Sequence, residues 1–151
     1  MTRTANLRRQ HEGALAIAGE ILAIIDRMGD EPSRDDAYAA TMLLAKLTGV
    51  LRIHFAQEDK LLYPSLMASG RGGVAAVARA FVEEMGQIGP AFAAFSEKWR
   101  SHGAIVAEPV LFRTECLALF AALADRIRRE NEELYPLADS LDENVTGHRA
   151  A

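Results

Sequence analysis

The sequence predicts an all-α fold, an up-down-up-down antiparallel four-helix bundle with a kinked third helix. Apolar residues recur at spacings of three and four through four long segments, which is typical of amphipathic helices. No segment alternates apolar and polar residues as a half-buried strand does. The connections between the four segments are short, so neighbouring helices are expected to run in opposite directions.

Length and composition agree with a single bundle domain over residues 1–140, followed by a polar tail at 141–151. Of the 151 residues, 50% are hydrophobic and 25% are charged, which is typical of a globular domain with a real core. The net charge of −4 argues against nucleic-acid binding. Glu12 and Glu20 interrupt the first apolar segment, so we expect no signal peptide, no membrane span and a cytoplasmic protein. The single cysteine, Cys116, excludes an internal disulfide and is expected on a buried helix face.

The first helix is predicted over residues 5–28, and its apolar stripe includes a histidine. The stripe consists of Leu7, His11, Ala14, Leu15, Ala18, Leu22 and Ile25. Residues 29–32 end this helix. Ser33 is the expected N-cap of the second helix, with Asp36 three residues later in a position like that of a capping box.

The second helix is expected to end, or to bend, near Tyr63 and Pro64, because a residue before proline disfavours the helical conformation. Its inward face is Leu43, Leu47, Val50, Leu51, His54, Glu58 and Leu62. Residues 69–73 form the clearest loop in the chain, since they contain three glycines and a serine.

The third helix is predicted from residue 74 to residue 99, with a bend or break between about residues 86 and 91. Gly86, Gly89 and Pro90 all lower helical stability there. Its inward face is Val74, Val77, Phe81, Met85, Ile88, Phe92, Phe95 and Trp99. Residues 100–108 are the last connection, and Pro109 suits the first turn of the fourth helix. The inward face of that helix is Phe112, Cys116, Leu119, Leu123, Arg126, Glu130 and Leu134.

The chain nearly repeats itself, as two helical hairpins at about residues 5–68 and 74–138. Residues 52–64 align with residues 124–136. In this alignment Glu58 matches Glu130, and Tyr63-Pro64 matches Tyr135-Pro136. His54, however, matches Arg126. His11 lies 43 residues before His54, and Met85 lies 41 residues before Arg126, so Met85 takes the place of His11 in the second hairpin. Only the first hairpin keeps its histidines.

The repeated positions are expected to meet in one layer of the core, because antiparallel neighbours bring the start of one helix level with the end of the next. The layer comprises His11, His54, Glu58, Met85, Arg126 and Glu130. His54 and Glu58 are four residues apart on one helical face, so both can hold one ion, and this ligand pair suits iron, zinc or manganese. Buried carboxylates need a cation, which either a metal or Arg126 can supply. His102 and His148 are expected outside this layer.

These residues resemble those of the hemerythrin-like family, the HHE cation-binding domain, over about residues 5–138. The resemblance implies that each hairpin supplies a histidine from its first helix and a His-x-x-x-Glu pair from its second. Together these six side chains would hold a carboxylate-bridged di-iron centre. The first hairpin matches with His11, His54 and Glu58. The second keeps only Glu130, because Met85 and Arg126 stand at the two histidine positions.

The two replacements lead us to expect no di-iron centre. Guanidinium stays protonated and cannot ligate a metal, and a thioether is a poor ligand for iron beside carboxylates. The favoured interpretation is a degenerate domain that holds no metal or one iron or zinc ion. It would act as a binding or regulatory module for an unidentified protein or small molecule. We expect neither enzymatic activity nor a membrane partner, and the sequence does not predict the oligomeric state.

Two alternatives stay open. One is a mononuclear centre held by His11, His54 and Glu58, with Glu130 as a fourth ligand and a position left for water or a small ligand. The other is a di-iron centre completed by a further carboxylate, for which the candidates are Glu83, Glu84 and Glu132. Such a centre would serve in the sensing, transport or detoxification of dioxygen or nitric oxide, or in iron–sulfur repair.

Overall fold

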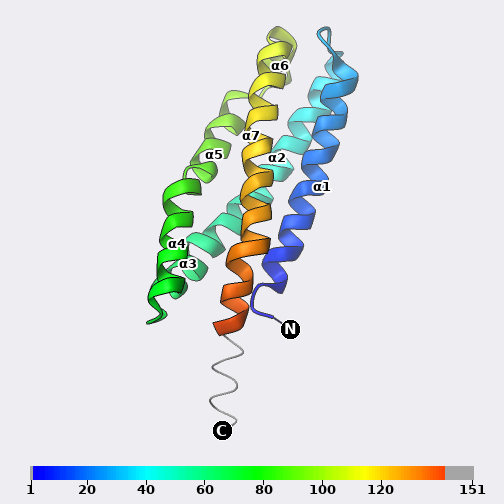
Figure 1. The fold of residues 1–151 in the computed structure, drawn as a ribbon. Helices are drawn as coiled ribbons and strands as arrows, with labels where there is room; N and C mark the ends of the chain where they lie inside the picture. The colour runs from blue at the N-terminus through cyan, green and yellow to red at the C-terminus, as the bar shows by residue number, and fades with distance from the viewer. Residues whose placement is uncertain (1, 142–151) are drawn as a thin grey trace.

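The computed structural model describes residues 2–141, which form four helical rods (Figure 1). The first rod is α1 (Ala5–Met28), and the second joins α2 (Arg34–Gln57), η1 (Glu58–Leu62) and α3 (Tyr63–Met67). The third joins α4 (Gly72–Met85) and α5 (Ile88–Lys98), and the fourth joins α7 (Pro109–Arg129), η2 (Glu130–Leu134) and helical residues 135–141. Successive rods run in alternating directions in Figure 1. No strand occurs in residues 2–141, so the all-α prediction is confirmed, whereas the predicted tail lies almost entirely outside this range.

The signals that separate the first two rods act as expected. Gly29 follows α1 with φ of 59°, a left-handed conformation that glycine adopts without strain. Ser33 caps α2, and its hydroxyl accepts a hydrogen bond of 3.1 Å from the backbone N–H of Asp36. Pro109 occupies the first turn of α7, as predicted. The connection before it contains a short helix that was not predicted, α6 (His102–Ala107).

The second rod does not end at Tyr63 and Pro64 but runs on to Met67, and its α-helical pattern is interrupted just before Tyr63. The α-helical pattern stops at Gln57, continues as the π-helical turn η1, and resumes as α3 to Met67. In this wider turn the backbone N–H of Tyr63 bonds to the carbonyl of Glu58. Pro64 therefore falls in the first turn of α3, where a helix does not need its missing N–H.

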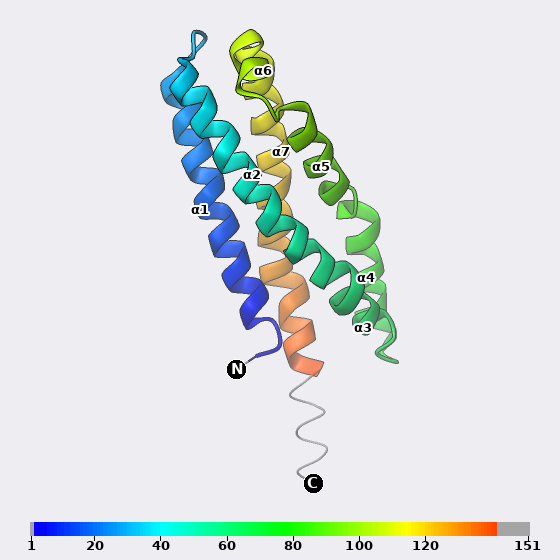
Figure 2. The same cartoon turned by 180° about the vertical axis from the view of Figure 1, so that it is seen from behind.

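The third rod breaks within the predicted interval, between Met85 at the end of α4 and Ile88 at the start of α5 (Figure 2). Gly86 makes this break possible, since a Cβ atom there would lie 2.5 Å from the carbonyl oxygen of Val82. Pro90 lies in the first turn of α5, where proline removes no helical hydrogen bond. The proline thus belongs to a new helix start and is not an interior kink.

We expect backbone amides of residues 86–94 to exchange with solvent faster than those of residues 47–55 in the neighbouring α2. The reason is that a helix start leaves unpaired N–H groups, and each glycine lowers helical stability by about 1 kcal/mol. Hydrogen–deuterium exchange measured by mass spectrometry compares the two segments in one sample. Equal protection of both segments would contradict this expectation.

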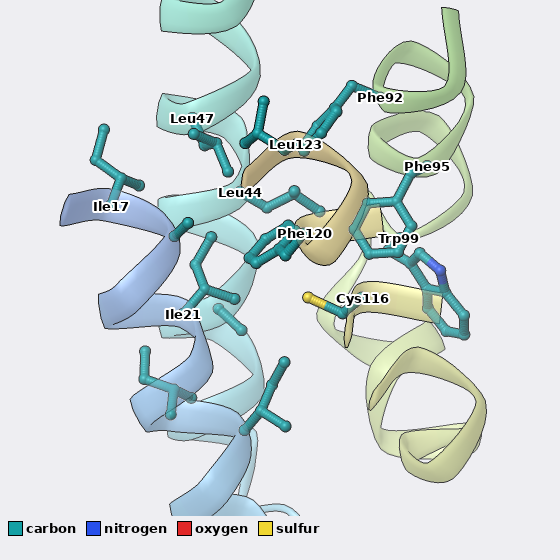
Figure 3. Packing of buried hydrophobic residues seen from close by; sticks show 14 of the residues in the cluster. Ile17, Ile21, Leu44, Leu47, Phe92, Phe95, Trp99, Cys116, Phe120 and Leu123 are labelled. Carbon is teal, nitrogen blue, oxygen red and sulfur yellow. The ribbon is translucent and has the colours of Figure 1, made fainter. Parts of the chain in front are cut away.

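Two apolar clusters fill the core, one on each side of the buried polar residues. The larger cluster packs α1, α2, α5 and α7 together and includes Ile21, Leu47, Phe92 and Leu123 (Figure 3). Cys116 lies inside it, fully buried as predicted. The smaller cluster lies at the end of the bundle where α1 begins. It contains Leu7, Leu62, Tyr63, Leu66, Ala78, Phe81, Met85, Leu134, Tyr135 and Ala138. The polar layer is therefore enclosed along the length of the bundle.

The core faces differ from the predicted stripes in detail. Leu15, predicted to point inward, is 41% exposed, while Ile17, Ile21 and Ile24 are buried. On α7, Phe120 is buried and Leu119 only partly so. In each case the buried residue lies next to a predicted one along the helix. The helix is therefore rotated slightly about its axis relative to the predicted apolar face.

The 34-residue rod Arg34–Met67 is long and apolar enough to cross a membrane by length and composition alone. Its most apolar window has a mean hydropathy of 1.2, and 33% of that window is buried in the bundle. This is weak evidence for a membrane span, because core helices pass the same test.

Candidate metal centre

The structure brings the predicted polar residues into one buried layer. His11 comes from α1, His54 from α2, and Glu58 and Glu130 from the first positions of η1 and η2. Their potential ligand atoms all lie within 4.8 Å of one another, and all four residues are buried. The layer thus presents two imidazoles and two carboxylates to a single point.

Arg126 occupies this layer as predicted, on α7 one turn before Glu130. Its side chain is 2% exposed. Nη2 donates to Oε1 of Glu58 at 3.0 Å, and Nε donates to Oε2 of Glu130 at 3.3 Å. Nη1 donates to the backbone oxygen of Met85 at 3.1 Å, and the guanidinium lies 4.3 Å from the centre of the Phe55 ring. One guanidinium therefore links both carboxylates and the end of α4.

The electrostatics keep Arg126 charged. Burial lowers the pKa of its guanidinium, but the charges of Glu130 and Glu58 outweigh this effect, so the pKa lies above its ordinary value. Burial raises the pKa of Glu130, and the charge of Glu58 adds to that shift, while His11 and Arg126 oppose it. The two glutamates thus repel each other, and the arginine offsets part of that repulsion.

Two amide side chains orient the histidines. Nδ1 of His11 lies 2.8 Å from Oδ1 of Asn131, and Nδ1 of His54 lies 2.7 Å from Oε1 of Gln10. An amide oxygen only accepts hydrogen bonds, so each Nδ1 carries the proton and donates it. In His54, whose ring is neutral at pH 7, the lone pair is then on Nε2, which lies 3.0 Å from Oε1 of Glu58. This is the tautomer that metal-binding histidines use.

Nε2 of His54 is a buried polar atom without a hydrogen-bond partner among the described residues. It lies 3.0 Å from Oε1 of Glu58, but outside hydrogen-bond geometry. Burial, followed by the charge of His11, lowers the pKa of His54 to about 4, so the ring is neutral at pH 7 and this contact is not an ion pair. A lone pair that faces a carboxylate oxygen at this distance needs a proton or a cation between the two atoms.

Two buried tyrosines each donate a hydrogen bond to the glutamate of the other hairpin. Tyr63 of the first hairpin donates to Oε2 of Glu130, and Tyr135 of the second donates to Oε2 of Glu58 at 2.7 Å. The hydroxyl of Tyr135 also lies 3.1 Å from Nε2 of His11. Burial and the two glutamate charges raise the pKa of both phenols, so they remain protonated donors.

The roles of these tyrosines, and of Gln10 and Asn131, were not predicted from the sequence. A signal was present, because each tyrosine follows its glutamate by five residues in both hairpins. In an ordinary α-helix that spacing points the two side chains apart. The π-helical turns η1 and η2 bring them back to one face, and the sequence does not reveal those turns.

Among residues 2–141, His11, His54, Glu58 and Glu130 form the one group of at least three potential metal ligands. The Met85 side chain packs in the smaller apolar cluster, and Arg126 offers no ligand atom. The further carboxylates considered above do not reach the layer: Glu83 is exposed, Glu84 pairs with Arg129 at 2.6 Å, and Glu132 pairs with Arg128 at 3.1 Å. None of these three carboxylates therefore adds a ligand atom to the layer in this structure. His102 is exposed at the start of α6, and His148 lies outside the described residues.

A helical bundle that directs imidazoles and carboxylates into one buried layer defines a cation-binding helical domain. The chain belongs to the hemerythrin HHE cation-binding family, whose model matches residues 2–138. Neither a curated protein nor a solved structure matches the chain.

Proposed function

We propose that this domain has exchanged one of the two metal positions of its family for an internal arginine. In this proposal it acts as a binding or regulatory module that holds no metal or one weakly held ion. The observation that carries the proposal is the buried guanidinium of Arg126, bonded to Glu58 and Glu130 together. A fixed positive charge there does what a second cation would do for the two carboxylates, and it leaves no room for that cation.

The residues that remain fit a single ion. His11, His54, Glu58 and Glu130 would hold it, and the partnerless Nε2 of His54 is the observation that favours this arrangement. An iron or zinc ion at this point would supply a Lewis-acidic position for water or a small ligand. Gln10 and Asn131 orient the two rings through their Nδ1 atoms, so that each Nε2 faces the carboxylates.

A binding role is favoured over an enzymatic one by the chemistry of the candidate nucleophile. Cys116 is the only thiol, and burial raises its pKa to about 12, so it is neither accessible nor ionised at pH 7. In the polar layer, His11, Glu58 and Glu130 are engaged in hydrogen bonds with their neighbours, and Nε2 of His54 is the atom without a partner. We further propose a cytoplasmic protein with a protein or small-molecule partner.

We expect at most one transition-metal ion per chain after aerobic loading with iron or zinc, because residues 2–141 contain only one such group of donors. Elemental analysis of the loaded, desalted protein measures the ratio. We also expect no near-ultraviolet absorption band of a bridged iron pair. Two irons per chain together with that band would disprove the proposed loss of the second position.

A matched pair of histidine variants shows whether any bound ion is at this site. His54→Ala removes a ligand from the layer and should abolish saturable zinc binding in calorimetry. His102→Ala removes an exposed histidine outside the layer and should leave binding unchanged. Equal binding by both variants would place the ion elsewhere.

A further inference from the structure

A small cavity opens on the surface between α2 and the start of α5. The two helices pack against each other beside the break between α4 and α5 (Figure 2). The volume of the cavity is about 240 Å³. Its inner wall includes the buried residues Leu51, Phe55 and Phe92, and its mouth includes the exposed residues Pro90 and Ala93. Pockets for drug-sized ligands measure about 300–1,000 Å³, so this cavity suits a smaller molecule.

The inner half of the cavity is apolar and aromatic. Two rings, those of Phe55 and Phe92, line it, and the hydroxyl of Thr48 beside them donates its proton to the carbonyl of Leu44 at 2.8 Å. Gly89 leaves space next to one of these rings, because a Cβ atom there would lie 3.3 Å from Cδ2 of Phe55. An aromatic group of a ligand fits this half, since rings pack favourably edge to face or offset.

The mouth of the cavity carries one positive and one negative side chain. Arg52 and Asp59 line it and are exposed, and neither forms a hydrogen bond or an ion pair with another described residue. They are seven residues apart on the second rod, a rise of about 10 Å, and Phe55 lies between them. The cavity thus offers a guanidinium and a carboxylate to its ligand above an aromatic floor.

We propose that this cavity binds a free α-amino acid with an aromatic side chain. The guanidinium of Arg52 donates hydrogen bonds to the ligand carboxylate, and the carboxylate of Asp59 accepts them from the ligand ammonium group. The aromatic side chain packs inward against Phe55 and Phe92. A free α-amino acid carries both charged groups on one carbon atom, so it meets both charges of the mouth at once. A peptide separates these two groups, and a simple amine or acid has only one of them.

This inference rests on the proposed binding role and names the class of small molecule that the domain binds. Phe55 connects the cavity with the polar layer, because its ring lines the cavity and also lies 4.3 Å from the guanidinium of Arg126. That guanidinium is bonded to Glu58 and Glu130. A ligand that packs on Phe55 therefore holds the ring against the arginine that replaces the second cation.

A nuclear magnetic resonance titration of the metal-free full chain with L-phenylalanine tests the proposal. We expect saturable shifts of the amide signals of residues 48–59 and 89–93, and of the Nε–H signal of Arg126. The indole N–H signal of Trp99, which does not line the cavity, should stay in place. If no signal from the cavity shifts at millimolar L-phenylalanine, the proposal is overturned. The metal ratio of the loaded protein tests the lost second metal position separately, so the two proposals can fail independently.

A matched pair of alanine variants tests the location. Ala93→Leu puts a larger side chain into the mouth of the cavity and should abolish the binding of L-phenylalanine. Ala45→Leu makes the same change at an exposed position of α2 outside the cavity and should leave binding unchanged. Circular dichroism confirms that both variants are folded. Equal binding by the two folded variants would show that the ligand binds elsewhere.

Ligands that lack one charged group test the chemical class. Phenethylamine lacks the carboxylate and hydrocinnamate lacks the ammonium group, so each should bind about fivefold or more weakly than L-phenylalanine. Arg52→Gln should weaken the binding of L-phenylalanine by a similar factor but leave that of phenethylamine unchanged. Asp59→Asn should likewise weaken the binding of L-phenylalanine and leave that of hydrocinnamate unchanged. If either single-charge ligand binds the wild type as tightly as L-phenylalanine does, the cavity is not an amino-acid site.

Discussion

Replacing Arg126 with alanine is expected to lower the free energy of unfolding by about 3–5 kcal/mol, because it leaves buried carboxylates without a partner. Glu58 and Glu130 are both fully buried, so water does not replace the lost donors. The variant also loses the bond to the carbonyl of Met85 and the contact with the Phe55 ring. For a domain of this size the loss corresponds to a fall in melting temperature of about 6–20 °C.

Thermal and denaturant unfolding of metal-free protein measure this effect. The matched control is Arg128→Ala, two residues along the same helix, where the arginine is exposed and pairs only with Asp125 and Glu132. An exposed ion pair contributes about 0–1 kcal/mol, so the control should melt close to the wild type. If Arg126→Ala also melts within a degree of the wild type, the arginine does not stabilise the carboxylates as a metal would.

Zinc binding tests whether Arg126 stabilises the polar layer through its positive charge. In Arg126→Ala the two glutamates and two histidines remain, and a divalent ion can supply the missing positive charge. We therefore expect added zinc to raise the melting temperature of this variant more than that of the wild type. An equal rise in both proteins would show that the arginine and the ion do not compete for the same carboxylates.

The positions of the site residues could be predicted because they repeat. Regular spacing of apolar residues gave the helices, and the alignment of the two hairpins placed His11, His54, Glu58, Arg126 and Glu130 at one height. The bonds from Arg126 to both glutamates follow from that placement and from the need to neutralise buried carboxylates. The spacing of apolar residues and the presence of buried charges can both be read from a single sequence.

The features that were missed depend on local backbone geometry or on contacts between distant segments. The π-helical turns have no composition signature, and without them Tyr63 and Tyr135 would point away from the glutamates. Gln10 and Asn131 orient the histidines from positions next to site residues, where a helix usually turns side chains aside. The exposure of Leu15 reflects the rotation of α1 in the bundle, which depends on all its neighbours together.

Restoring both histidines is expected to raise the metal content from at most one ion to two per chain. Met85→His combined with Arg126→His recreates the six-ligand set that the family resemblance implies. The two positions are already neighbours, because Nη1 of Arg126 reaches the backbone oxygen of Met85 at 3.1 Å. Removing the guanidinium frees Oε1 of Glu58 and Oε2 of Glu130, and each new imidazole supplies a neutral ligand in its place.

The single variants are the controls for this experiment, and they isolate the role of the arginine. Met85→His alone adds a ligand but keeps the fixed positive charge, so it should bind no more metal than the wild type. Arg126→His alone removes the charge but leaves the second position one ligand short, so it should bind a second ion weakly if at all. Elemental analysis and the near-ultraviolet band of a bridged iron pair are measured for all four proteins after identical loading. If the double variant folds but still binds at most one ion, the arginine is not what closes the second position. The break after Met85, which ends α4 one residue before Gly86, would then be the feature that keeps its side chain from the layer.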